Sequence, residues 1–126
     1  KLADVPRKQR PKVFLEVRSM PSLLTCGSDS VAYDVIRRAG GRPLYRNAGS
    51  VKKVSLEFVV DREPDAYIQQ QGVMNPDPVP PQEHSVLQSL DCVQKGNIKQ
   101  MDEELISRPT LNIADAVVKI YNFLYN

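Results

Sequence analysis

Glu57 is the acidic residue whose neighbours give it the clearest structural setting. It falls in the first turn of a predicted short helix, where a carboxylate interacts favourably with the positive end of the helix dipole. Ser55, two residues earlier, is the predicted N-cap of this helix. Leu56, Val59 and Val60 are expected to face a sheet, which leaves Glu57 pointing outward. A carboxylate in this position is either a solvated surface residue or a contact point for another molecule.

A second set of candidate side chains follows the predicted strands. In an open α/β sheet, ligands bind beyond the carboxyl ends of the strands. The loops after predicted strands ending at Val17, Tyr45 and Gln70 therefore supply the candidate ligand-binding residues. These candidates are Arg18, Met20, Tyr45, Arg46, Gln71, Met74 and Asn75. Arg18 and Arg46 are suited to pairing with an anionic ligand, although each is also an ordinary exposed loop residue.

The sequence holds no motif that predicts catalysis. His84 and Ser85 are adjacent, but a catalytic triad depends on spatial geometry and not on adjacency in sequence. There is no Gly-x-Ser-x-Gly elbow, no Gly-x-Gly-x-x-Gly and no phosphate-binding loop. Without these motifs, we do not expect an enzyme. Cys26 and Cys92 lack the spacing of metal ligands and the chain has one histidine, so we do not expect a zinc site. The two thiols are either separate, the commoner arrangement in a domain of this size, or joined in a disulfide.

The composition is that of one globular domain. The 126 residues suffice for a buried core, and 41% are hydrophobic while 25% are charged. The net charge of +2 gives no basis for nucleic-acid binding. No apolar run approaches the roughly 18 residues of a membrane span. The chain opens with a basic, proline-containing stretch and not with an export signal, so residues 1–11 are expected to be a linker or the end of an upstream element.

The rest of the pattern predicts strands that alternate with helices. A buried strand is expected at 12–17, and a helix from Ser28 or Ser30 to Ala39, ended by glycines. The other expected elements are a strand at 43–45, a loop at 46–53, the Glu57 helix ended by Pro64, a strand at 65–70, a proline-rich loop at 72–81, a helix at 82–90, a hairpin of strands at 92–95 and 98–101, and a helix at 111–125. This alternation implies an α/β domain of three layers, with a largely parallel central sheet and helices on both faces.

Five stretches occur in an order typical of one protein family. They are residues 10–17, the helix with its Arg-Arg-Ala-Gly-Gly ending, residues 54–68 with Glu57, residues 93–102, and Arg108-Pro109 before the last helix. In this order they resemble the C-terminal lobe of substrate-binding proteins of ABC importers, in the class with a rigid interlobe helix. The family usually has an asparagine after Ala-Gly-Gly, whereas this chain has Arg42-Pro43.

The resemblance implies two lobes joined by one long helix, with the ligand held between them. Residues 12–126 would be the C-terminal lobe and residues 1–11 the tail of the interlobe helix. The implied protein is periplasmic or lies on the outer face of the cell membrane, has no resident cofactor, and binds a metal chelate of the iron-siderophore, haem or cobalamin type. Glu57 would pair with arginines of the permease, because such pairs are directional and set the register of docking. His84 would serve as a haem ligand only if it faced the cleft.

A flavodoxin-like signalling or interaction domain is the alternative, since it would share this fold. A receiver of that kind should carry an acidic cluster at the strand ends, but the first predicted strand ends in Glu16-Val17-Arg18, without an acidic pair. A second lobe and an export signal upstream in the gene would separate the two interpretations. The ligand itself stays open, because siderophore, haem, cobalamin and oxyanion binders share the scaffold.

Overall fold

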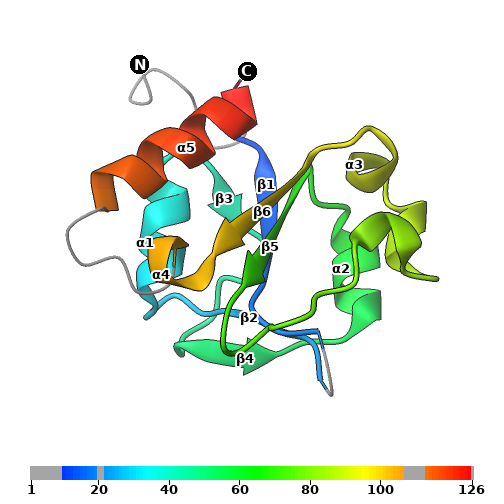
Figure 1. Cartoon of the computed structure of the whole chain (residues 1–126). Helices are drawn as coiled ribbons and strands as arrows, with labels where there is room; N and C mark the ends of the chain where they lie inside the picture. The colour runs from blue at the N-terminus through cyan, green and yellow to red at the C-terminus, as the bar shows by residue number, and fades with distance from the viewer. Residues whose placement is uncertain (1–9, 20–21, 107–112, 126) are drawn as a thin grey trace.

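The computed structural model describes residues 10–19, 22–106 and 113–125. Its centre is a parallel sheet with the strand order β3-β1-β5-β6 (Figure 1). The strands are β3 (Arg42–Pro43), β1 (Lys12–Glu16), β5 (Ala66–Gln71) and β6 (Ile98–Asp102). β1 lies inside the sheet, where Val13 is opposite both Pro43 of β3 and Ala66 of β5.

Helices cover both faces of this sheet. On one face lie α1 (Val31–Arg38), α4 (Glu103–Ile106) and α5 (Ile113–Tyr125), as Figure 1 shows. On the other face lie α2 (Leu56–Arg62) and α3 (Asp91–Gln94). The predicted three-layer α/β fold with a parallel central sheet is therefore confirmed.

Strand β1 supplies side chains to two separate cores. Val13 and Leu15 belong to the cluster under α1, α4 and α5. Phe14 points the opposite way and packs with Tyr67 of β5, their ring centroids 5.3 Å apart. Successive side chains of a strand alternate between faces, so a strand buried on both faces needs the continuous apolar run found here.

The starts of α1 and α2 follow from their capping serines. Ser30 Oγ accepts a hydrogen bond from the Tyr33 N–H at 3.1 Å, and Ser55 Oγ accepts one from the Phe58 N–H at 3.1 Å. Each bond satisfies one of the amide groups that a helix leaves unpaired in its first turn. Both predicted N-caps, with Ser30 as the choice at the first helix, are confirmed.

The predicted strand at 92–95 is wrong, because residues Asp91–Gln94 form helix α3. Cys92 and Val93 are both buried in the second core, and two adjacent apolar residues fit the inner side of one helical turn as well as they fit a strand. The hairpin is also wrong, since β6 runs parallel to β5, with Ile98 opposite Tyr67.

Smaller differences concern the loops. The expected loops before and after α1 contain β2 (Leu24–Cys26) and β4 (Val51–Lys53), which form a separate antiparallel pair. All three residues of β4 are exposed, so the sequence carries no apolar alternation that would signal a strand.

Two predicted elements differ in extent or type. The predicted strand at 43–45 begins one residue earlier and is shorter, and the predicted helix at 82–90 contains only the 3-10 turns Pro81–Glu83 and Leu87–Ser89. Residues 107–112, where the last helix is expected to begin, lie outside the described residues.

Glu63 ends α2 in the left-handed conformation, with φ 45° and ψ 73°. Its N–H donates to the carbonyl oxygen of Val59 at 3.2 Å, which closes the last turn before Pro64. This conformation is unfavourable for an L-residue by about 1–2 kcal/mol. We predict that Glu63→Gly raises the free energy of unfolding by about 0.5–1 kcal/mol, measured by urea denaturation.

The matched control is Asp61→Gly, which places the same residue type inside the same helix. Asp61 is exposed and helical, so its replacement should lower the free energy of unfolding by about 0.3 kcal/mol, the difference between the helix propensities of aspartate and glycine. A Glu63→Gly protein that loses as much stability as Asp61→Gly would contradict the left-handed helix end.

Candidate functional site

An open pocket of about 480 Å³ lies where the parallel strands end, and we call it the carboxyl-end pocket. Val17 follows β1, Gln70 belongs to β5, and Glu103 begins α4 directly after β6. The rest of the lining is Cys26, Asp29, Ser30, Val31, Ala32, Ser50, Val51, Val73 and Met74. The pocket therefore occupies the place where α/β sheets bind their ligands.

The walls of the carboxyl-end pocket are apolar and exposed. Val31, Val51, Val73 and Met74 all line it, and all four are among the exposed large hydrophobic residues of the chain. They come from the start of α1, the start of β4 and the loop after β5. Exposed apolar side chains that gather in one place mark an interaction surface more than scattered ones do.

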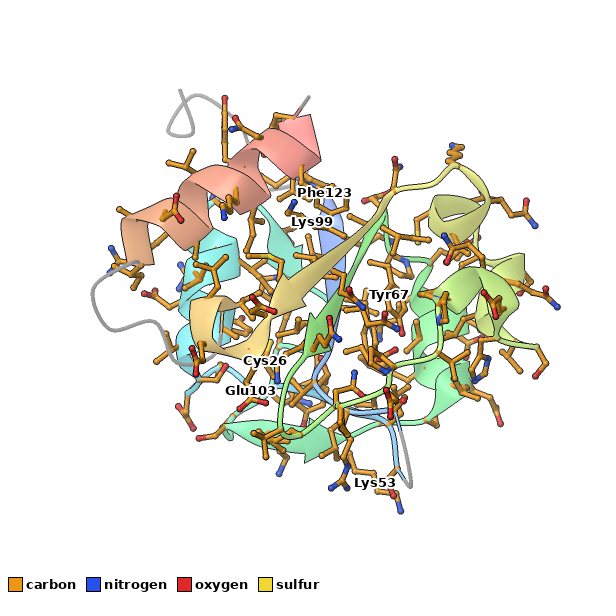
Figure 2. All side chains as sticks on the ribbon, in the orientation of Figure 1. Cys26, Lys53, Tyr67, Lys99, Glu103 and Phe123 are labelled. Carbon is orange, nitrogen blue, oxygen red and sulfur yellow. The ribbon has the colours of Figure 1, made fainter. Side chains whose placement is uncertain are left out.

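Two carboxylates fix the loops around this pocket. Glu103 is buried, and its Oε1 accepts hydrogen bonds from the Met74 N–H at 3.1 Å and from Gln70 Nε2 at 3.4 Å. Asp29 Oδ2 accepts a hydrogen bond from the Gly49 N–H at 2.8 Å. Figure 2 shows Glu103 and Cys26 near one another at this end of the sheet. Both acids belong to the lining of the pocket.

A buried polar network on the other face of the sheet anchors the loop that carries Met74. Glu16 is 1% exposed, and its carboxylate accepts hydrogen bonds from the Tyr67 hydroxyl at 2.5 Å and from Asn75 Nδ2 at 2.8 Å. Asn75 Nδ2 also donates to the carbonyl oxygen of Gln70 at 2.8 Å, and Asn75 Oδ1 accepts from the Ser19 N–H at 3.3 Å. Burial, reinforced by the Glu16 carboxylate, raises the pKa of Tyr67 well above its usual value.

The predicted ligand-binding residues do not form one group. Met74 lines the carboxyl-end pocket, and Gln71 lines a neighbouring pocket of about 270 Å³ that shares Val73 and Glu103 with it. Asn75 is 3% exposed and bound into the network around Glu16.

The remaining candidates are placed elsewhere. Tyr45 is half-buried against Phe58, with ring centroids 5.9 Å apart. Arg46 lines two pockets of about 250 and 270 Å³ beside the edge strand β3, and neither shares a residue with the carboxyl-end pocket. Arg18 is partly buried and is absent from the lining of the carboxyl-end pocket, while Met20 lies outside the described residues.

Glu103 is the lining residue that a correct strand assignment would have revealed. It directly follows β6, so it obeys the rule that selects residues at the carboxyl ends of parallel strands. The hairpin interpretation of residues 92–101 concealed it, since a hairpin strand would run the opposite way. Val31 and Val51 carry no such signal, because nothing local to either residue indicates that the fold brings them together.

Glu57 and His84 have different surroundings. Glu57 is exposed in the first turn of α2, as expected from its position after the Ser55 cap. The ring nitrogen Nδ1 of His84 accepts hydrogen bonds from the Val86 and Leu87 N–H groups at 3.1 and 3.2 Å. His84 therefore stabilises a local turn, and it is not among the residues that line the carboxyl-end pocket.

Cys26 and Cys92 are free thiols on opposite faces of the sheet. Burial raises the pKa of each thiol to about 11. Within the described residues, no His, Cys, Asp and Glu side chains are grouped so that they could hold a metal ion. The same part of the chain includes no helix with the length and apolar character needed to cross a membrane.

Comparison with solved structures connects this fold to known binding proteins. A periplasmic solute-binding protein of Staphylococcus epidermidis, described as a possible iron-binding protein, aligns with a TM-score of 0.77 and 21% identity, over 99% of this chain and 49% of that one. The molybdate-binding protein MolA of Haemophilus influenzae, with molybdate bound, aligns with a TM-score of 0.79 and 23% identity, over 98% of this chain and 38% of that one.

The vitamin B12-binding protein BtuF of Vibrio cholerae aligns with a TM-score of 0.70 and 19% identity, over 98% of this chain and 46% of that one. No family model matches the sequence, and no curated protein matches it. The chain spans about half or less of the three solved proteins. It thus has the fold of one lobe of such a binding protein, as the sequence resemblance predicted.

Removing the Tyr67 hydroxyl should destabilise the fold measurably. Tyr67→Phe keeps the ring packing but removes one of the two hydrogen bonds described above for the buried Glu16 carboxylate, and the bond from Asn75 remains. We predict a loss of about 1.5–3 kcal/mol in the free energy of unfolding, measured by urea denaturation. Tyr33→Phe, which removes a hydroxyl from a partly buried tyrosine, should change it by less than about 0.5 kcal/mol. Equal effects of the two substitutions would show that the Glu16 network contributes nothing particular.

The free energy of unfolding should decrease at alkaline pH. The native thiols, with pKa values of about 11, hold their protons more tightly than unfolded thiols, whose usual value is 9.0. Above pH 9 the unfolded chain therefore releases protons first, and the free energy of unfolding decreases up to about pH 11. Urea denaturation at intervals of pH measures this slope. Cys26→Ala should make the slope shallower, and an unchanged slope would contradict the assignment.

Proposed function

We propose that this chain is a substrate-binding lobe of an ABC importer, which holds a metal chelate against a second lobe and presents it to the permease. The observation that carries the proposal is the structural match of 97–99% of the chain to half or less of each of several binding proteins. A single lobe of a two-lobe protein would match in this way, with nearly all of its own length aligned to about half of the other protein. Residues 1–11 would then be the tail of the helix that joins the lobes.

The carboxyl-end pocket is the proposed contribution of this lobe to the ligand site. It is open to one side and offers exposed apolar side chains, so a ligand held there would need a second wall to exclude water. Met74 lies in this pocket and Gln71 beside it. The named ligands of similar structures include haem, vitamin B12, molybdate and iron complexes, of which a metal chelate is the proposed class here. The protein would work in the periplasm or on the outer face of the cell membrane.

Glu57 is the proposed contact with the permease. Its carboxylate is exposed and fixed at the start of a capped helix, which suits a directional pair with an arginine. Exposed pairs contribute little to stability, but they guide association and fix the orientation of two proteins. The flavodoxin-like alternative gains no support, because the similar structures described above are named as binding proteins.

The proposal predicts that Glu57 matters for transport and not for ligand capture. In the protein with both lobes, Glu57→Arg should leave the affinity for the imported chelate within about twofold, or roughly 0.4 kcal/mol. Uptake through the cognate importer should fall, because like charges would face each other at the permease. The measurement is uptake by cells at matched expression, with the chelate first chosen by thermal shift among ferric hydroxamate, haem and cobalamin.

Asp61→Arg is the matched control, since Asp61 is exposed on the same helix but lies in its last turn. It makes the same change in charge and should leave uptake near the wild-type level. Wild-type uptake by Glu57→Arg would reduce Glu57 to an ordinary surface residue. Equal loss of uptake with both substitutions would point to the charge of the whole helix and not to a contact at Glu57.

A further inference from the structure

Two pockets lie beside the edge strand β3, and we call them the edge pockets. Their volumes are about 250 and 270 Å³, and both are lined by Arg42, Pro43 and Arg46. Neither shares a residue with the carboxyl-end pocket, so the proposed function leaves them without a role. Arg42 stands where the family described above usually has an asparagine, and Arg46 is a predicted ligand-binding residue that lines no part of the carboxyl-end pocket.

Most residues that line the edge pockets are cationic. The first pocket has four arginines among its seven lining residues, together with Tyr33, and it has no acid within the described residues. The second pocket has three arginines, one lysine and a single acid, Asp61. The cations of the two pockets together are Arg10, Lys12, Arg37, Arg42, Arg46 and Arg62.

The positive charge of the first pocket does not depend on the residues outside the described ranges. Those residues contain one acidic side chain, Asp4, and four basic ones. Arg10 has a further interaction and is left out of the count. The other three arginines of the pocket would still outnumber a single acid, so the sign stays positive.

The arginines of the first pocket have hydrogen-bond donors to offer. Arg42 is half-buried, and its Nε donates a hydrogen bond to the carbonyl oxygen of Arg10 at 2.9 Å. That bond fixes the plane of the guanidinium and leaves its terminal amino groups without a partner among the described residues. Arg37 and Arg46 are exposed, and neither side chain forms a hydrogen bond or an ion pair with a described residue. Each guanidinium carries five N–H donors, so most of the donors at this pocket are unused.

Unpaired arginines around a small pocket suit phosphate groups. Like charges that gather in one place repel one another, and a bound anion would offset that repulsion. A carboxylate has two oxygens and pairs with one guanidinium, whereas a terminal phosphate group has three acceptor oxygens and can pair with several. None of the exposed large hydrophobic residues lines either edge pocket, so the surface favours a polar ligand.

We propose that the edge pockets bind a compact oligophosphate, an anion with two or three linked phosphate groups. Arg42 and Arg46 line both pockets, so they lie between linked groups that occupy one pocket each. Arg37 pairs with the group in the first pocket, and Arg62 with the group in the second. The proposal goes beyond the proposed function and does not depend on it, because the two sites share no residue.

The test is a titration of the isotope-labelled chain with pyrophosphate, tripolyphosphate, inorganic phosphate and citrate, followed by two-dimensional NMR. The amide signals of Arg37, Arg42 and Arg46 should shift, whereas those of Val51 and Val73 in the carboxyl-end pocket should not. At least one oligophosphate should bind about tenfold or more tightly than inorganic phosphate and citrate. Citrate has a charge similar to that of pyrophosphate but carries only carboxylates, so it separates phosphate chemistry from charge alone.

A pair of variants tests whether the binding belongs to the edge pockets. Arg46→Gln removes a cation that lines both pockets and forms no hydrogen bond or ion pair with a described residue, so the fold should persist. It should weaken oligophosphate binding about tenfold or more. Arg38→Gln is the matched control, since Arg38 lies next to Arg37, is paired with Asp34 at 2.6 Å and lines neither pocket. It removes the same charge and should change the affinity by less than about twofold. The NMR spectrum of each variant reports whether it is folded.

Four results would overturn the proposal. Equal affinity for citrate and the oligophosphates would show attraction by charge alone. Equal weakening by Arg46→Gln and Arg38→Gln would show a diffuse basic surface and not a site. Shifts confined to Val51 and Val73 would place the binding in the carboxyl-end pocket. Binding to phosphatidylglycerol vesicles without binding of either oligophosphate would indicate a membrane contact. The proposed function is tested separately, by uptake, and stands or falls without this site.

Discussion

The burial of the Glu16 carboxylate is the constraint on which the rest of the domain depends. A carboxylate at 1% exposure is tolerated only when hydrogen bonds replace its water, and this one obtains them from Tyr67 and Asn75. Tyr67 belongs to the neighbouring strand, and Asn75 to the loop after that strand. One side chain at the end of the central strand thus fixes both the pairing of β1 with β5 and the path of the loop that leads to the pocket.

Carboxylates that hold loops by accepting hydrogen bonds are also found on the other face of the sheet. Glu103 holds the Met74 amide, and Asp29 holds the Gly49 amide, so carboxylates take up backbone donors that the loops would otherwise leave unpaired. The position of the loops around the carboxyl-end pocket therefore depends on two acidic side chains that accept hydrogen bonds from the loop backbone.

The sequence predicted the elements whose signals are local. Three such elements are found as expected: the helix capped by Ser30, the helix capped by Ser55, and the apolar strand β1. Each depends on residues that lie close together in the sequence. The helix α3 and the parallel direction of β6 depend on distant contacts, so the hairpin interpretation of this region failed. At the site, Met74, which the strand-end rule selected, lines the carboxyl-end pocket, and its role in ligand binding stays a prediction. It could not place Val31 and Val51, which three-dimensional packing alone brings to the same place. It also could not show that the pockets lined by Arg46 are separate from the carboxyl-end pocket.

The separation of the two thiols by the sheet has a consequence for the study of its motions. Cys26 lies in the core beneath α1 and α5, and Cys92 in the core beneath α2 and α3. Both side chains are buried, at 3% and 2% exposure, so opening of its own layer makes each more accessible to a thiol reagent. Layers of one domain open with different free energies. The labelling rate of each cysteine thus reports how often its own layer of the domain opens. The chain carries, without any engineering, a pair of reporters that distinguish a fluctuation of one layer from unfolding of the whole domain.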